Sequence, residues 1–234
     1  MGSRIQEQRA LLTDYDTDTA YSQAFYTLFA NIRFHWESEA GSQDMPPTNT
    51  VHALQVTSAS AYSGQATVTA NLAIVAAQSG SETILVDADL RAPALRQRFG
   101  LSSGAGLSDL LKKGDITPQR IATCLQPTFV PGLRVLGAGD APVQNSALLL
   151  SPHLGQVVTG LRDLLAASGR GSGVALFHSA AVLSGADAAL IGALTDQTVL
   201  AIIVGQTTRL QAKQAQEQLE QAHTKLAGVV MLHP

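Results

Sequence analysis

The chain has 234 residues, of which 45% are hydrophobic and 14% are charged, a length and composition that can bury a sizeable core and predict a soluble α/β protein. The net charge of −3 gives no positive surface for nucleic acid or for an acidic membrane. A single cysteine, Cys124, excludes an internal disulfide and suits a reducing cytoplasm.

The first expected element is an amphipathic helix at residues 17–36, because apolar side chains recur there every three or four positions. These apolar residues are Phe25, Leu28, Phe29 and Ile32. A linker is expected at 41–50, which contains two consecutive prolines. We therefore expect an N-terminal helix and linker at 1–50 and the main domain at 51–234, which together form one globular unit.

Beyond residue 50 the chain alternates strand and helix patterns, which is typical of βαβ units. The strands are expected at 53–57, 83–87, 133–136, 173–177, 199–204 and 227–231. The helices are expected at 66–79, 92–99, 106–112, 152–168, 186–195 and 207–225. Two continuous apolar runs, 174–177 and 199–204, indicate strands that are covered on both faces. The sequence therefore predicts an α/β fold with a doubly wound, mainly parallel sheet and helices on both faces, and no apolar run reaches the ~20 residues of a membrane span.

The segment 54–67 has the placement of a phosphate-binding loop, because an apolar strand leads into a turn of small residues and then into a helix. Such a loop uses glycines to bring backbone N–H groups to the phosphates, a lysine on the outer phosphates and a hydroxyl on Mg²⁺. Gly64 is present, but Gln65 stands where the lysine is expected and Ala66 where the hydroxyl is expected. These residues indicate a nucleotide-binding fold that has lost its catalytic chemistry.

Three later runs share a resemblance: they read ILVDADLRAP at 84–93, GLSDLL at 106–111 and LLLSP at 148–152. With LTDY at 12–15, they resemble the bacterial tyrosine kinases (BY-kinases) of capsule and exopolysaccharide systems, which are MinD/ParA-like P-loop ATPases. The resemblance runs from about Leu11 to the last residue. It implies a P-loop NTPase-like fold and, for the family, an ATP-dependent protein-tyrosine kinase activity. The altered phosphate loop makes this chain a degenerate member of that family.

In the resembled family, an acidic motif that holds Mg²⁺ and orients the attacking hydroxyl falls on Asp87 and Asp89, and both are present. A further metal-binding aspartate falls on His178, and an asparagine that contacts adenine falls on Leu232. The resemblance thus implies that Asp87, Asp89 and His178 are vestigial catalytic residues, without a metal site. It implies a vestigial nucleotide-binding set of Gly64, Gln65, Ala66, Thr67 and Leu232.

Each of these residues also has a purely structural interpretation. Asp87 and Asp89 can cap the following helix and accept turn hydrogen bonds. His178 can be a zinc ligand or a general base, but a buried, hydrogen-bonded histidine is favoured because the sequence places no second ligand beside it. Tyr62 can stack on a nucleotide base or fill the altered phosphate site.

Members of the resembled family assemble through a first-helix pattern of one glutamate and two arginines. The pattern falls on Gln23, Tyr26 and Phe29, so all three charges are absent and an octameric ring held by ion pairs is not expected. The two aromatic residues can instead belong to the core or form a hydrophobic interface, which predicts a monomer or a dimer. The family also phosphorylates a C-terminal tyrosine cluster, whereas no tyrosine follows Tyr62 here.

The favoured function is that of a pseudokinase that regulates capsule or exopolysaccharide synthesis or export through protein contacts. The resemblance implies a membrane-spanning chain-length regulator (co-polymerase) or an active kinase paralogue as partner, no nucleic acid, and a cytoplasmic chain recruited to the inner face of the plasma membrane. No cofactor is expected beyond weakly bound ATP and Mg²⁺. One alternative is a weak tyrosine kinase or ATPase that uses Asp87 and Asp89. Another is a MinD/ParA-like positioning protein, which the segment 207–225 disfavours because it lacks a basic amphipathic pattern.

Overall fold

The computed structural model describes residues 11–14, 16–39, 50–62, 64–140, 146–169 and 171–232. The expected linker at 41–50 lies outside these residues except for its last position, and Tyr15 also lies outside them. The division of the chain at residue 50 therefore stays a prediction.

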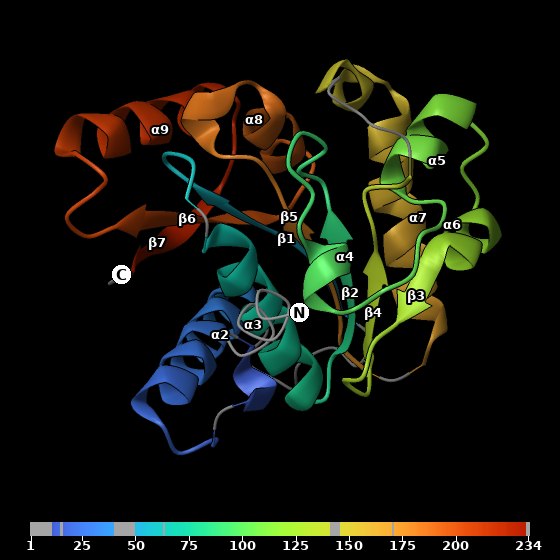
Figure 1. Cartoon of the computed structure of the whole chain (residues 1–234), viewed down its shortest axis with the longest axis horizontal. Coiled ribbons are helices and arrows are strands. Elements are labelled where there is room, and N and C mark those ends of the chain that lie inside the picture. Colours follow the sequence, from blue (N-terminus) through green and yellow to red (C-terminus); the bar gives the residue numbers. More distant parts are fainter. Residues whose placement is uncertain are drawn as a thin grey trace.

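A seven-stranded sheet forms the centre of the molecule, with the strand order β3-β4-β2-β5-β1-β6-β7 (Figure 1). Its strands are β1 (Val51–Ser58), β2 (Glu82–Asp87), β3 (Leu125–Pro127), β4 (Leu133–Leu136), β5 (Gly173–His178), β6 (Gln197–Ile203) and β7 (Leu226–Leu232). All neighbouring strands are parallel except β3 and β4, which run antiparallel. The predicted α/β fold with a mainly parallel sheet is confirmed.

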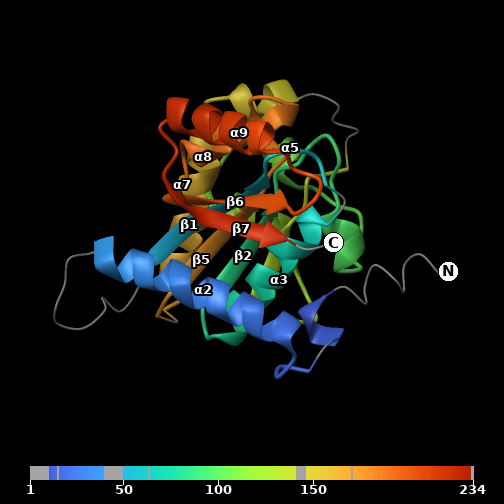
Figure 2. The same ribbon diagram turned by 90° about the vertical axis from the view of Figure 1, so that its left-hand side faces the viewer.

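Helices cover both faces of the sheet, as a doubly wound fold requires (Figure 2). The elements on one face are η1 (Leu12–Asp14), α2 (Ala20–Glu39), α3 (Gln65–Gln78) and α4 (Leu95–Arg98). Those on the other face are α5 (Leu107–Lys113), α6 (Pro118–Cys124), η2 (Ser146–Leu150), α7 (His153–Ala167), η3 (Val182–Ser184), α8 (Asp187–Gly192) and α9 (Arg209–Gln221). None of the helices in the described ranges has both the length and the apolar character that a membrane crossing requires.

Two short consecutive elements, α6 and β3, were missed by the sequence patterns. Helix α6 does carry a start signal, because the side chain of Thr117 accepts a hydrogen bond from the backbone N–H of Arg120 and Pro118 occupies the first position. The helix expected at 92–99 is wrong in its first turn, since α4 begins only at Leu95. The strand expected at 133–136 has the predicted bounds. The other expected elements are present with displaced ends, most of all α9, which ends at Gln221 rather than at 225.

Helix α2 packs along α3. This packing buries Phe29, one of the three residues predicted to form an interface with a second chain. Phe29 is 2% exposed, and its ring lies edge-on to the ring of Trp36 with centroids 6.2 Å apart. Phe29 therefore belongs to the core and is not available to a second chain. Tyr26 is half-buried and donates a hydrogen bond to Oε1 of Gln78 at 2.7 Å, whereas Gln23 is exposed. An interface at Gln23 and Tyr26 stays a prediction.

Candidate functional site

The candidate site lies where three parallel strands end side by side. Strands β1, β2 and β5 run in the same direction, and the register pairs both Val56 and Asp87 with His178. The carboxyl ends of these strands therefore meet at one edge of the sheet, beside the start of α3. A cavity of about 480 Å³ opens there, and its lining includes Tyr62, Gln65, Ala66, Asp89, Arg91 and His178.

Gln65, the first residue of α3, is built into the ends of the strands and is only 5% exposed. Its Nε2 donates a hydrogen bond to the carbonyl oxygen of Ser179 at 2.5 Å, and its Oε1 accepts one from the hydroxyl of Ser58 at 2.6 Å. Both polar atoms of the amide are thus paired within the protein. A lysine would present a positive charge to a phosphate, whereas this amide is neutral.

Tyr62 lies over Gly64 at the start of the same helix. A Cβ atom added at Gly64 would lie 2.3 Å from Cε1 of Tyr62, which means that the ring rests directly on the glycine. The same tyrosine lines the cavity of about 480 Å³ and a second cavity of about 560 Å³. The ring therefore takes up space beside the loop, while its stacking on a base stays a prediction.

His178, the last residue of β5, is a buried and neutral histidine. Burial, and to a smaller extent the positive charge of Arg98, lowers its pKa to about 3. Nδ1 of His178 lies 3.2 Å from the hydroxyl of Thr69, which donates to the carbonyl oxygen of Gln65 at 3.2 Å. Since Thr69 uses its one proton on that carbonyl, we assign the imidazole proton to Nδ1. A neutral ring that donates in this way supplies no negative charge to a metal ion.

Asp87 ends β2 and is completely buried. Its Oδ2 accepts hydrogen bonds from the backbone N–H groups of Ala94 and Leu95 at 3.0 and 2.9 Å, so this carboxyl group caps the start of α4. Its Oδ1 has no hydrogen-bond partner among the described residues. Burial raises the pKa of Asp87 to about 7, with a smaller contribution from the charge of Asp89. The carboxyl group of Asp87 therefore holds its proton at pH values where an ordinary aspartate is ionised.

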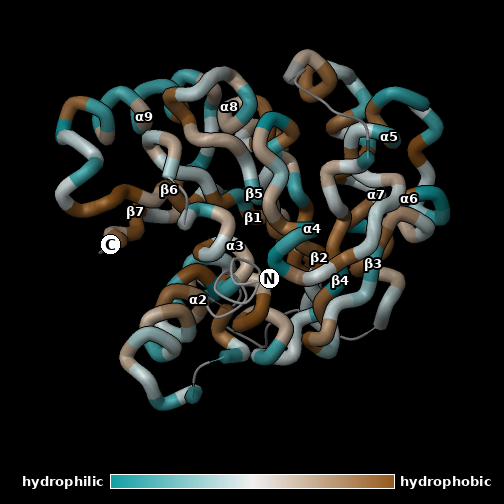
Figure 3. Tube along the Cα trace, viewed as in Figure 1, coloured by the Kyte–Doolittle hydropathy of each residue, from teal (hydrophilic) through white to brown (hydrophobic). Residues whose placement is uncertain are grey.

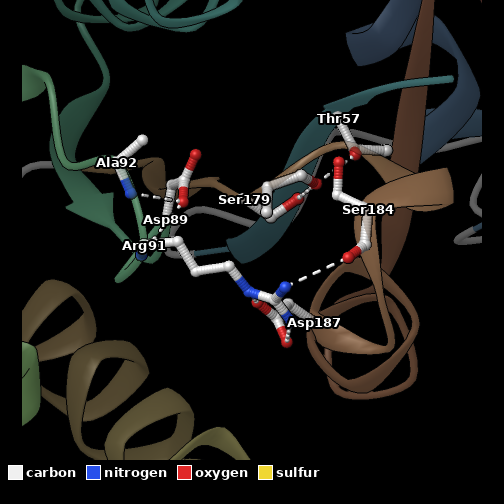
Figure 4. A network of polar contacts seen from close by, with 8 residues as sticks. Thr57, Asp89, Arg91, Ala92, Ser179, Ser184 and Asp187 are labelled. Atoms are coloured by element: carbon white, nitrogen blue, oxygen red, sulfur yellow. Dashed lines mark hydrogen bonds and ion pairs between the residues drawn. The ribbon is translucent and has the colours of Figure 1, made fainter. Parts of the chain in front are cut away.

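Asp89 and Arg91 fix the loop that follows β2 (Figure 4). Oδ1 of Asp89 accepts hydrogen bonds from the backbone N–H groups of Arg91 and Ala92 at 3.2 and 3.0 Å. The guanidinium of Arg91 donates to the two carboxylate oxygens of Asp187 at 3.0 and 3.3 Å and to the carbonyl oxygen of Ser184 at 3.1 Å. Sequence reasoning missed this ion pair, since Asp187 lies 96 positions further along and no pattern connects the two residues.

The five residues expected to contact a nucleotide do not line one cavity. Gln65 and Ala66 line the cavity of about 480 Å³. Gly64, Thr67 and Leu232 line the one of about 560 Å³, which extends along α2 to Leu28 and to the end of β7. Two residues of the expected phosphate loop, Gly64 and Thr67, therefore share a cavity with Leu232, whereas Gln65 and Ala66 face the other cavity.

The family resemblance implies a nucleotide with Mg²⁺, and the side chains at this edge of the sheet do not fit it. No lysine lines the cavity of about 480 Å³, and Ala66 offers no hydroxyl. Across the described ranges, no three His, Cys, Asp or Glu side chains come together in a way that could hold a metal ion. The polar groups at this cavity include the hydroxyl of Tyr62, the carboxylate of Asp89 and the guanidinium of Arg91, whose charge is already paired with Asp187.

The two buried titratable groups give opposite pH dependences of stability. Asp87 keeps its proton from pH 3.8, its ordinary pKa, up to about 7, whereas the unfolded chain loses that proton, so stability falls as the pH rises. His178 stays neutral from 6.5, its ordinary pKa, down to about 3, whereas the unfolded chain gains a proton, so stability falls as the pH falls. Between pH 3.8 and 6.5 the two effects oppose each other.

We therefore expect that Asp87→Asn removes the opposing effect of Asp87, so that the pH dependence of stability caused by His178 becomes measurable. Denaturant unfolding of this variant should show a free energy of unfolding that rises by up to about 1.4 kcal/mol per pH unit between pH 4.5 and 6, relative to the unaltered protein. His178→Gln should change the slope in the opposite direction. Parallel pH profiles for the unaltered protein and both variants would contradict the assigned charge states.

No family model matches the chain. The tyrosine-protein kinase YwqD of Bacillus subtilis is 30% identical over 230 residues, which cover 98% of this chain and 87% of the relative. A putative tyrosine-protein kinase, EpsB of Ralstonia solanacearum, is 30% identical over 167 residues. That match covers 71% of this chain but only 21% of EpsB, so the chain spans about a fifth of that longer relative.

Solved structures give the same result for the fold. The crystal structure of the chimerical protein CapA2B2 superposes with a TM-score of 0.78 at 25% identity, over 95% of this chain and 88% of the chimera. The septum site-determining protein MinD of Pyrococcus horikoshii, complexed with Mg-ADP, superposes with a TM-score of 0.60 at 18% identity, over 78% of this chain and 70% of MinD. This second likeness concerns the fold alone, which is that of a P-loop NTPase.

Proposed function

Because the chain belongs to the BY-kinases, the bacterial tyrosine-kinase family of MinD/ParA-like P-loop ATPases, we propose that it acts as a pseudokinase of that family. In this proposal it regulates capsule or exopolysaccharide synthesis or export through protein contacts, without transferring phosphate itself. The observation that supports it most is Gln65, whose amide is paired within the protein at the position where the family resemblance expects lysine.

Energetics favour loss of activity over a change of specificity. Phosphoryl transfer depends on positioning and on neutralisation of charge by lysine and Mg²⁺. Removal of one positive charge about 4 Å from a phosphate costs on the order of 4 kcal/mol at an effective dielectric constant of 20. That loss alone is roughly a thousandfold in rate. Ala66 and His178 stand where two further metal-holding groups are expected, so the losses accumulate.

The proposed partner is a membrane-spanning regulator of polysaccharide chain length, or an active kinase of the same family. The chain is proposed to lie in the cytoplasm and to reach the inner face of the plasma membrane through that partner. Family membership supports this part of the proposal.

A second candidate is a weak ATP-dependent tyrosine kinase or ATPase. Two observations favour it: Asp87 and Asp89 are both retained at the end of β2, and the relatives YwqD and EpsB are named as tyrosine-protein kinases or putative ones. A positioning role like that of MinD is less favoured, because the only basic residues of α9 are Arg209 and Lys213.

Incubation of the purified chain with γ-labelled ATP and Mg²⁺ distinguishes the two candidates. A pseudokinase takes up no more label than its Asp87→Asn variant, which keeps the volume of the buried side chain and removes its charge. Label on Tyr15, Tyr21 or Tyr26 that disappears in Asp87→Asn would instead establish the weak kinase. Circular dichroism of both proteins serves as the folding control.

A further inference from the structure

Strand β7 lies at the edge of the sheet but has the sequence of an interior strand. It pairs with β6, and no other described element pairs with it. Figure 2 shows β7 nearest the viewer, with α9 above it, α2 below it and no helix or strand in front of it. Its seven residues, LAGVVML, include no charged or polar side chain. Continuous apolar runs are typical of strands buried on both faces, and exposed edges normally carry lysine or proline.

Apolar side chains remain exposed on both sides of this strand. Val229 is 53% exposed and Met231 is 61% exposed. A groove of about 540 Å³ runs between β7 and α2, lined by Leu28, Val230 and Phe34, and Phe34 is 66% exposed. The strand appears in Figure 3 as a hydrophobic segment at the outside of the molecule. Apolar surface gathered in this way marks an interaction site.

The outer edge of β7 also has backbone hydrogen-bonding groups that none of the described residues pairs. The carbonyl oxygen of Leu232 accepts a hydrogen bond from the N–H of Val204 at the end of β6, so the backbone of Leu232 faces β6. Because successive residues of a strand face opposite edges, Val229 and Met231 direct their N–H and C=O groups away from β6. Those groups are available to an additional strand.

We propose that this edge is covered by the same edge of a second copy of the chain, in an antiparallel pair of β7 strands about a two-fold axis at Val229. The sequence is self-complementary about that residue. Gly228 faces Val230 of the other copy and Ala227 faces Met231, so a small side chain meets a larger one on each side of the axis. At the axis, the two Val229 residues exchange N–H···O=C hydrogen bonds.

A second copy fits this edge better than a charged partner does. The edge carries no charge, so it neither repels an identical strand nor attracts an acidic or basic one. A two-fold contact also satisfies both edges at once and closes the assembly as a dimer. If the two-fold axis is perpendicular to the sheet, the α2 helices of both copies lie on the same face of the combined sheet. The exposed Phe34 of each copy then adds to the buried surface, and a specific contact requires about 1,000 Å² of it.

Sedimentation velocity tests the dimer. The unaltered chain is expected to dimerise with a dissociation constant on the order of tens of micromolar, as suits a small interface. Val229→Lys with Met231→Lys is expected to weaken dimerisation at least tenfold, because the two new charges at position 229 lie opposite each other at the axis and those at position 231 lie diagonally beside them. Leu210→Lys is the matched control, since this leucine is 65% exposed on α9 and lies outside the proposed contact.

Cysteine crosslinking tests the register and does not depend on the lysine variants folding. A hydrogen-bonded antiparallel pair places Cα atoms about 5.5 Å apart, which a disulfide can bridge. Val229→Cys is therefore expected to form a covalent dimer under mild oxidation, whereas Leu210→Cys, at a position that is also more than half exposed, is not. The native Cys124 is buried, so we expect no crosslink in the unaltered chain.

Three results would overturn the proposal. The first is a monomer up to about 200 μM, which would leave the edge to a different protein. The second is a dimer that survives the two lysine substitutions, which would place the contact elsewhere, for example at Gln23 and Tyr26. The third is equal crosslinking of the two cysteine variants. None of these results depends on whether the chain transfers phosphate.

Discussion

Phe29→Ala is expected to lower the free energy of unfolding by about 3–5 kcal/mol, measured by denaturant titration. The side chain is 2% exposed and packs edge-on against Trp36, so its removal leaves a cavity between α2 and the rest of the core. The family resemblance placed this residue at a subunit contact, and a contact residue would behave differently. Its loss would change the oligomeric state and leave the stability of the monomer nearly unaltered.

Phe34→Ala is the matched control for this prediction. It removes the same side chain from the same helix, but Phe34 is 66% exposed. At a protein concentration too low for dimers, we expect the free energy of unfolding to change by less than about 0.5 kcal/mol. Equal effects of the two substitutions would mean that α2 is not packed as described.

The second prediction with a large expected effect is that restoring the phosphate loop alone does not restore nucleotide binding. Gln65→Lys with Ala66→Ser returns two of the groups that a phosphate loop uses. We nevertheless expect this double variant to bind Mg-ATP with a dissociation constant no tighter than about 1 mM, because His178 stays neutral and the side chain of Leu232 cannot accept or donate a hydrogen bond. Adding His178→Asp supplies the missing carboxylate, and this triple variant should bind at least about tenfold more tightly than the double variant.

Micromolar affinity in the double variant, measured by isothermal titration calorimetry, would show that His178 and Leu232 matter less than proposed. The matched control places lysine and serine on the exposed side of α9, as Gln214→Lys with Gln218→Ser. Those changes add the same residue types far from the cavity and should not alter nucleotide binding.

The sheet was predictable because its strands carry their own pattern. The run Val174–Phe177 is apolar throughout, and the structure buries it as part of β5 between two layers of helices. The three-residue strand β3 was not predictable, since Leu125–Pro127 is too short for any period and pairs antiparallel only because the chain turns back on β4. The helix at 92–99 was placed too early because residues before Leu95 form a turn that Asp87 and Asp89 stabilise by hydrogen bonds.

The part of the site formed by residues at the ends of parallel strands was predictable. The hydrogen bonds between a helix and two different strands were not. Because Asp87 and His178 end parallel strands, their meeting follows from topology alone. The pairing of Gln65 with Ser58 and Ser179 was beyond the sequence, since it depends on how far α3 sits from two different strands. The burial of Phe29 was left open for the same reason. Helical spacing identifies a face of α2 but does not say what covers it.

Calorimetric titration of the unaltered chain with Mg-ATP tests most directly whether the site has lost its nucleotide. With Gln65 paired inside the protein, Ala66 without a hydroxyl and His178 neutral, we expect no saturable heat up to about 1 mM nucleotide. A one-to-one isotherm with a dissociation constant of about 10 μM, abolished by Asp87→Asn, would contradict the pseudokinase proposal and support an active kinase.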